Sequence, residues 1–101
     1  MKNITLAEYQ KLVEQLVKQR GFEKETPHQV FALLIEEVGE LSKALRKLDG
    51  IKSDKNSQHH ILEEEAADVF FMLVDFCNRM DMDLEQAFAD KEAKNQQRNW
   101  A

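Results

Sequence analysis

Two segments of the chain each carry a pair of acidic residues three positions apart. Glu37 and Glu40 form the first pair, and Glu65 and Asp68 form the second. Residues at this spacing are neighbours on one side of an α-helix. Four carboxylates that converge repel one another and cannot all stay ionised without a cation. Because all the ligands are oxygens, the pattern predicts a site for Mg²⁺, with Mn²⁺ as a substitute, if the two helices face each other.

The apolar residues beside these acids distinguish them from ordinary surface charge. On a helical wheel, Glu37 lies at the edge of an apolar stripe, with Leu33 one turn before it. Asp68 has Phe71 and Met72 as its next-turn neighbours, which draws it toward the interior. A carboxylate in such a place needs compensation, and a shared metal ion would supply it. Other acidic residues fit solvated helix faces, namely Glu8, Glu14, Glu63 and Glu85.

Capping residues mark the beginnings of three predicted helices. Thr5 and Glu8 form a possible capping box, in which each side chain binds a free backbone N–H of the first turn. Thr26 is a suitable N-cap because Pro27 follows it at the first helical position, and Asp83 can cap a last helix. The first of these helices is expected to end at Gly21, and the second at Asp49-Gly50.

The polar sequence IKSDKNSQHH, residues 51–60, predicts a loop that joins the two acid-bearing helices. On that loop His59 and His60 are interpreted as solvated residues, with a metal-ligand role as the alternative. The third helix is expected from about Ile61 to Met80. The fourth is expected to bury Leu84, Ala87 and Phe88.

Composition sets the broad class of the protein. A third of the 101 residues are charged, and one Pro and three Gly leave few breaks, so we expect one all-α domain spanning residues 1–101. The net charge of -5 argues against nucleic-acid binding. The sequence has neither a membrane-length apolar stretch nor a signal-like start, which favours a cytoplasmic protein without membrane contact. The single Cys77 is expected to be a buried, inert thiol.

The order of the acids resembles a family signature. Glu36-Glu37-Val38-Gly39-Glu40 is followed, after 24 residues, by Glu65-Ala66-Ala67-Asp68, which is EExxE and then ExxD. This arrangement resembles the MazG-like nucleoside triphosphate pyrophosphohydrolases of the all-α NTP pyrophosphatase superfamily. The similarity includes LIEEVGELSKALRK and DLEQAFADKEAKNQQR and covers roughly residues 5–100.

The resemblance implies a four-helix MazG-like bundle completed by homo-oligomerisation. It implies that Mg²⁺ is held by Glu37, Glu40, Glu65 and Asp68. It gives catalytic roles to Glu36, Glu37 and Glu64, where Glu36 or Glu64 would orient or deprotonate the attacking water, or bind an additional ion. It implies that the nucleotide is gripped by Lys91, Asn95 and Arg98.

The reaction implied by the resemblance converts a nucleoside triphosphate and water to the monophosphate and pyrophosphate. A housecleaning role on non-canonical or excess dNTPs is the expected setting. The alternatives are a non-catalytic helical dimer that binds nucleotides or a protein partner, and a plain oligomeric bundle with surface charge. The complete set of four acids favours the enzyme.

The third helix also predicts assembly, because apolar residues from Val69 to Cys77 surround it on nearly every side. A helix that is apolar all round must be buried all round, and a chain of this size cannot do that alone. We expect a homodimer or homotetramer, and the resemblance implies that the active sites lie near the subunit boundary. Base recognition stays open among five candidates: Tyr9, Phe22, His28, Phe31 and Trp100.

Overall fold

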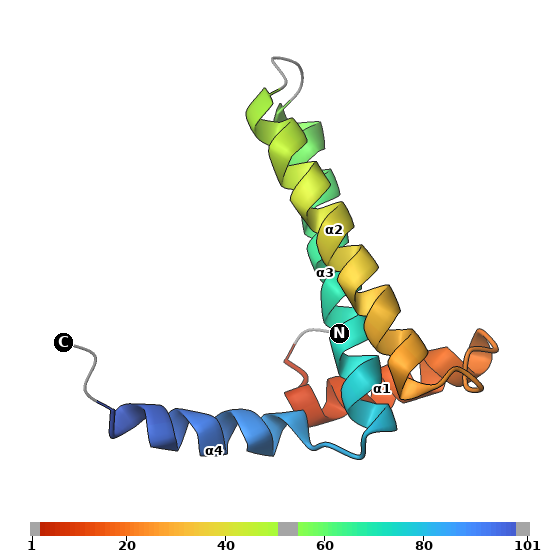
Figure 1. Ribbon diagram of the computed structural model, residues 1–101, viewed down its shortest axis with the longest axis vertical. Helices are drawn as coiled ribbons and strands as arrows, with labels where there is room; N and C mark the ends of the chain where they lie inside the picture. The colour runs from red at the N-terminus through yellow and green to blue at the C-terminus, as the bar shows by residue number, and fades with distance from the viewer. Residues whose placement is uncertain (1–2, 51–54, 99–101) are drawn as a thin grey trace.

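The computed structural model describes residues 3–50 and 55–98, and every regular element within them is an α-helix. The helices are α1 (Leu6–Gln19), α2 (Pro27–Gly50), α3 (Lys55–Arg79) and α4 (Leu84–Gln96). Helices α2 and α3 form a long antiparallel hairpin, α1 crosses its base, and α4 extends away from it (Figure 1). The expected all-α class is confirmed. No helix of the described residues is long and apolar enough to cross a membrane.

The predicted caps are confirmed in atomic detail. The Thr5 N–H donates to Glu8 Oε1 at 3.0 Å, and the Glu8 N–H donates to Thr5 Oγ1 at 3.1 Å. The first of these bonds lowers the pKa of the Glu8 carboxyl, because it favours the charged form. Thr26 and Gln29 exchange the same pair of bonds at 2.8 and 3.1 Å. At the start of α4, Asp83 Oδ1 accepts a hydrogen bond from the Gln86 N–H at 3.0 Å.

Two helices end with a residue in the left-handed conformation. Gly21 follows α1 with φ +77°, and the next N–H bonds back to the Val17 carbonyl at 2.9 Å. At the end of α3, Asp81 takes the same position with φ +54°, and the Met82 N–H bonds to the Cys77 carbonyl at 2.9 Å. This hydrogen-bond pattern satisfies carbonyls that the helix leaves without partners. It also sets the direction in which the chain leaves each helix.

The core lies where α1 crosses α3. Val13 and Val17 pack against Val74, with Phe71 and Leu84 around them. The Cys77 thiol is buried nearby at 2% exposure, and burial raises its pKa, as expected for an inert thiol.

One glutamine joins three elements at this crossing. The Gln10 amide donates to Asn78 Oδ1 and to the Met82 carbonyl, both at 2.9 Å. Its oxygen accepts the Leu84 N–H at 2.9 Å, and the Asn78 amide donates to the Gln10 carbonyl at 2.8 Å. These bonds fix the base of the hairpin and the start of α4 on α1.

The loop predicted for residues 51–60 is wrong for residues 55–60, which form the first turns of α3; residues 51–54 lie outside the described residues. His59 and His60 are therefore exposed helical residues, each 3.8 Å from a Glu63 oxygen. His60 also lies 3.5 Å from Glu64. Side chains three and four positions apart meet on a helix, which accounts for these pairs. In the described part of the chain these histidines join no group of metal-ligating atoms.

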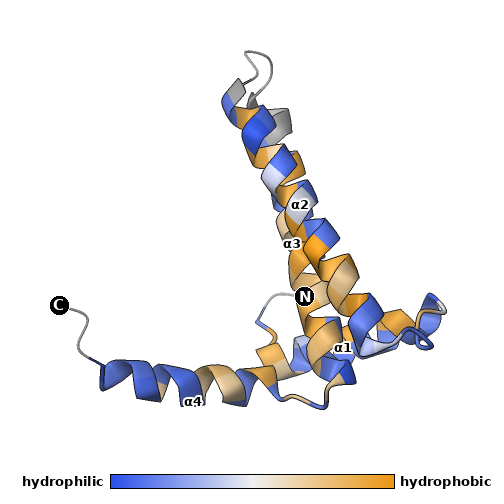
Figure 2. Ribbon diagram, viewed as in Figure 1, coloured by the Kyte–Doolittle hydropathy of each residue, from blue (hydrophilic) through white to orange (hydrophobic). Residues whose placement is uncertain are grey.

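The predicted buried side of α4 is largely wrong. Leu84 packs against the core, but Ala87 is exposed and Phe88 is 68% exposed, because α4 packs against α1 at its start and then extends away from the hairpin. Hydrophobic stretches also run along α2 and α3 (Figure 2). Large apolar side chains exposed there are Phe31, Ile35, Val38, Leu45, Ile61, Phe70 and Leu73.

Candidate metal centre

Three carboxylates converge where α2 faces α3. Glu37 on α2 and Glu65 and Asp68 on α3 each place one oxygen within 4.8 Å of the others. Glu37 and Glu65 are half-buried, whereas Asp68 is exposed. The antiparallel hairpin produces this meeting, because it aligns the middle of α2 with the middle of α3. Oxygens at this separation can share one hard divalent cation, so the donor set fits Mg²⁺ or Mn²⁺.

The electrostatics of the cluster are those of uncompensated negative charge. Burial raises the pKa of the Glu37 carboxyl above its ordinary value. The charges of Asp68, Glu65, Glu40 and Glu36 raise it further, in that order. Each of these effects disfavours the ionised carboxylate, and a bound cation would reverse them.

The other predicted acids lie around this cluster. Glu40, predicted as a fourth ligand, is exposed and stands outside the three-carboxylate group, although its charge acts on Glu37. Glu36 and Glu64 are both exposed. Glu64 approaches the His60 imidazole, as described above.

A groove of about 450 Å³ adjoins the cluster and shares Glu37 and Asp68 with it. Its apolar side consists of Leu33, Phe71 and Met72. The segment between α1 and α2 closes the groove with Arg20, Phe22 and Glu25, and Asp75 completes its lining. The Arg20 guanidinium lies over the Phe71 ring, 5.4 Å from the ring centroid, and is the only cation among these lining residues.

Among the aromatic candidates for base recognition that the structure describes, Phe22 is the one that lines this groove. Tyr9 packs edge-on against Phe70, with 5.5 Å between ring centroids. Phe31 packs against Phe76 at 5.5 Å, and His28 lies with both in a separate, mainly apolar cavity. Trp100 lies outside the described residues.

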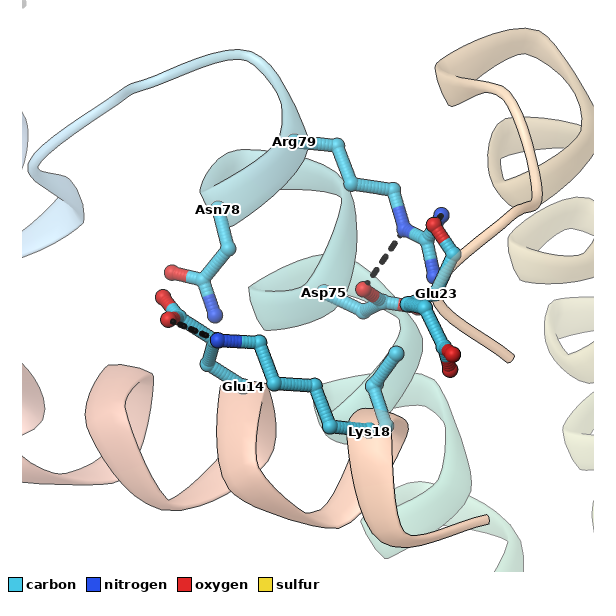
Figure 3. A pocket seen from close by; sticks show the side chains of 7 residues that line it. Glu14, Lys18, Glu23, Asp75, Asn78 and Arg79 are labelled. Atoms are coloured by element: carbon cyan, nitrogen blue, oxygen red, sulfur yellow. Dashed lines mark hydrogen bonds and ion pairs between the residues drawn. The ribbon is translucent and has the colours of Figure 1, made fainter. Parts of the chain in front are cut away.

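A buried ion pair, which the sequence pattern did not predict, lies beside the groove. Arg79 Nε donates to Asp75 Oδ1 at 2.8 Å, and these side chains are 12% and 5% exposed. Figure 3 shows the pair at a second cavity, of about 170 Å³, where Lys18 pairs with Glu14 at 3.2 Å. The available signal was an acid and an arginine four positions apart at the end of an apolar helix.

The predicted nucleotide-binding residues are not part of this groove. Lys91 and Asn95 lie on α4, and Arg98 follows just after the helix ends at Gln96. Lys91 and Arg98 are exposed, and Asn95 is half-buried. Because α4 extends away from the hairpin (Figure 1), one copy of the chain does not bring these residues to the three carboxylates.

A helical hairpin with three converging carboxylates beside a groove defines an all-α protein with a candidate site for a divalent cation. The family model of the MazG nucleotide pyrophosphohydrolase domain matches residues 25–100, about three quarters of the chain, and the chain belongs to this family. The resemblance inferred from EExxE and ExxD is thereby confirmed. The match contains α2, α3 and α4 and begins just before Pro27. No curated protein matches the chain.

Proposed function

We propose that this protein hydrolyses nucleoside triphosphates and deoxynucleoside triphosphates to the monophosphate and pyrophosphate, with Mg²⁺ as cofactor. Membership of the MazG family supports nucleotide pyrophosphohydrolase activity in general. The observation that carries the proposal is the meeting of Glu37, Glu65 and Asp68 within 4.8 Å across the hairpin. These three carboxylates would hold the metal, and Glu40 would join them by rotating its exposed side chain.

The residues of the site divide the chemistry between them. Glu37, Glu65 and Asp68 would hold Mg²⁺, which would supply Lewis-acid stabilisation of charge on the phosphoryl oxygens and the leaving pyrophosphate and would lower the pKa of the attacking water. Glu37 is a ligand whose own ionisation is disfavoured until the cation binds. Glu36 or Glu64, both exposed beside the ligands, orients the water or accepts its proton.

The substrate-binding side of the site requires a second copy of the chain. Lys91, Asn95 and Arg98 suit a phosphate chain, but α4 carries them away from its own groove (Figure 1). The apolar side chains exposed along α2 and α3, such as Phe31 and Leu73, also need a cover. A homodimer, or a tetramer built from two dimers, supplies both the cover and the basic residues at the groove.

A housecleaning role is the proposed setting, with non-canonical or excess dNTPs as substrates. It is tested by assaying natural NTPs and dNTPs, and modified dNTPs, with Mg²⁺ while measuring pyrophosphate and phosphate release separately. We expect pyrophosphate release that stops with a chelator. Nucleotide binding without turnover would instead support the non-catalytic helical dimer, and phosphate release would show that a different bond is cleaved.

Sharing of α4 between copies is tested by mixing two impaired variants at limiting substrate. Asp68→Asn spoils the metal ligands, and Lys91→Ala spoils the phosphate contact. If α4 serves the neighbouring copy, a mixed dimer contains one intact site, and an equimolar mixture after subunit exchange regains about a quarter of wild-type activity. If α4 serves its own chain, the mixture is no more active than the average of the two variants.

A further inference from the structure

Arg79 makes an unusual set of bonds to the segment between α1 and α2. Its Nη2 atom donates to the Phe22 carbonyl at 2.7 Å, and its Nη1 atom donates to the Glu25 carbonyl and, at 3.5 Å, to the Glu23 carbonyl. The Nε atom simultaneously donates to Asp75, which is buried beneath it. A planar guanidinium can satisfy several acceptors in one fixed geometry, which a lysine ammonium cannot reproduce.

The segment that Arg79 holds is a wall of the groove. Arg20, Phe22 and Glu25 line the same groove as Glu37 and Asp68. Phe22 is 48% exposed, so packing against the core does not hold it in place. Its position depends on the turn at Gly21 and on the bond from Arg79 to its carbonyl.

We propose that Arg79 is a positioning residue, which holds the Phe22 backbone so that the Phe22 side chain contacts the part of the nucleotide that extends beyond the metal. This inference rests on the proposed function, since it assigns a role in substrate binding. Asp75 orients the guanidinium from below, and its own side chain is only 5% exposed. Arg79 itself does not line the groove and acts through Phe22.

The test compares Arg79→Lys, Phe22→Ala and the double variant in steady-state kinetics. Arg79→Lys keeps a cation beside Asp75 but loses the bonds to several carbonyls. We expect KM for the triphosphate to rise about tenfold with kcat nearly unchanged, because a contact common to ground state and transition state is lost. Phe22→Ala should act likewise, and the double variant should be no worse than Phe22→Ala, because the two changes remove one contact.

A purely structural role for Arg79 gives a different result. Partial unfolding lowers the amount of active enzyme, so it reduces apparent kcat and leaves KM unchanged. The matched control is Lys18→Ala, which removes a basic residue of the neighbouring cavity whose pair with Glu14 is exposed. It should leave both constants unchanged. Unchanged KM in folded Arg79→Lys, or effects of Arg79→Lys and Phe22→Ala that multiply in the double variant, would overturn the proposal.

A second readout needs no enzymatic activity. Lys24 is exposed within the held segment, so trypsin should cleave after it faster in Arg79→Lys than in the wild-type protein or in Lys18→Ala. If circular dichroism shows that Arg79→Lys does not fold, Asp75→Asn is tested in its place. We then expect a smaller increase in the rate of trypsin cleavage. Absence of wild-type turnover would reject the proposed function alone. Unchanged cleavage in the folded variant would reject the role of Arg79 even in an active enzyme.

Discussion

One carboxylate oxygen of Glu37 lies within 4.8 Å of one carboxylate oxygen of Asp68, although the two residues belong to different helices of the hairpin. Apolar packing of α2 on α3 brings them together, since buried Val30 and Leu34 precede Glu37 and buried Val74 follows Asp68. The fold therefore holds two like charges close together at a cost in free energy. A divalent cation bound between them would attract both carboxylates and so remove this cost.

The first prediction concerns removal of either charge. Glu37→Gln and Asp68→Asn should each abolish Mg²⁺-dependent turnover. With a chelator present, both variants should unfold at the wild-type temperature or slightly above it, because repulsion between carboxylates is relieved. Thermal unfolding and pyrophosphate release measure the two effects. Glu63→Gln is the control, since Glu63 is exposed on the same helix; full activity in either site variant would remove that residue from the mechanism.

The second prediction concerns pH. The folded chain raises the pKa of Glu37 above that of the unfolded chain, so between these values the folded state binds more protons. The contribution of Glu37 to the stability of the metal-free protein is therefore fully present at low pH. It is lost as pH rises through the window above about 4.5. The melting temperature of wild type minus that of Glu37→Gln should decrease across the window. A difference that stays flat with pH would contradict the assigned cause.

A consequence for metal binding follows from the same shift. Mg²⁺ needs the ionised carboxylate, so its binding should release protons and strengthen as pH rises. Calorimetry in buffers of different ionisation enthalpy would count the protons released. As pH rises, the stability of the metal-free protein should thus fall, whereas Mg²⁺ binding should stabilise the metal-bound protein more.

The third prediction concerns α4. Lys91→Ala should raise KM for triphosphates more than it weakens inhibition by the monophosphate product, because Lys91 is assigned to the phosphate chain. Steady-state kinetics with product inhibition measures both constants. Lys94→Ala, on the same helix and also exposed, is the matched control. Equal effects on triphosphate and monophosphate would place Lys91 outside the phosphate site.

The fourth prediction concerns the turn before α4. Asp81 adopts φ +54°, which strains residues that carry a side chain, whereas glycine adopts it freely. Asp81→Gly should therefore stabilise the fold by about 0.5–1 kcal/mol, and Asp81→Ala should destabilise it by about 1 kcal/mol. Urea unfolding measures both changes, and a destabilised Asp81→Gly variant would show that the aspartate side chain has a role of its own.

Features determined by short stretches of sequence were predictable. The caps at Thr5, Thr26 and Asp83 depend only on residues within three positions, and the structure contains their bonds. Residues 55–60 were mispredicted because a polar stretch can form either a loop or an exposed helix start. Helical spacing to Glu63 and Glu64 was the overlooked local signal for His59 and His60.

Features that depend on tertiary packing were harder to predict. The i, i+3 acids and the family signature correctly pointed to the approach of Glu37 to Asp68. The bonds from Arg79 reach backbone carbonyls more than fifty residues away, and backbone acceptors leave no mark in the side-chain pattern. The exposure of Phe88 depends on the direction that α4 takes after Asp81, which apolar periodicity does not encode.

Because α4 extends away from the hairpin, hydrogen exchange of this helix can report whether copies of the chain assemble. No residue of Leu84–Gln96 is buried in one copy of the chain. In an isolated protomer, amide hydrogens of this helix should exchange with deuterated solvent far faster than those of α2 or α3. Slowing of that exchange as protein concentration rises would report the docking of α4 on a neighbouring copy, independently of nucleotide, metal or turnover.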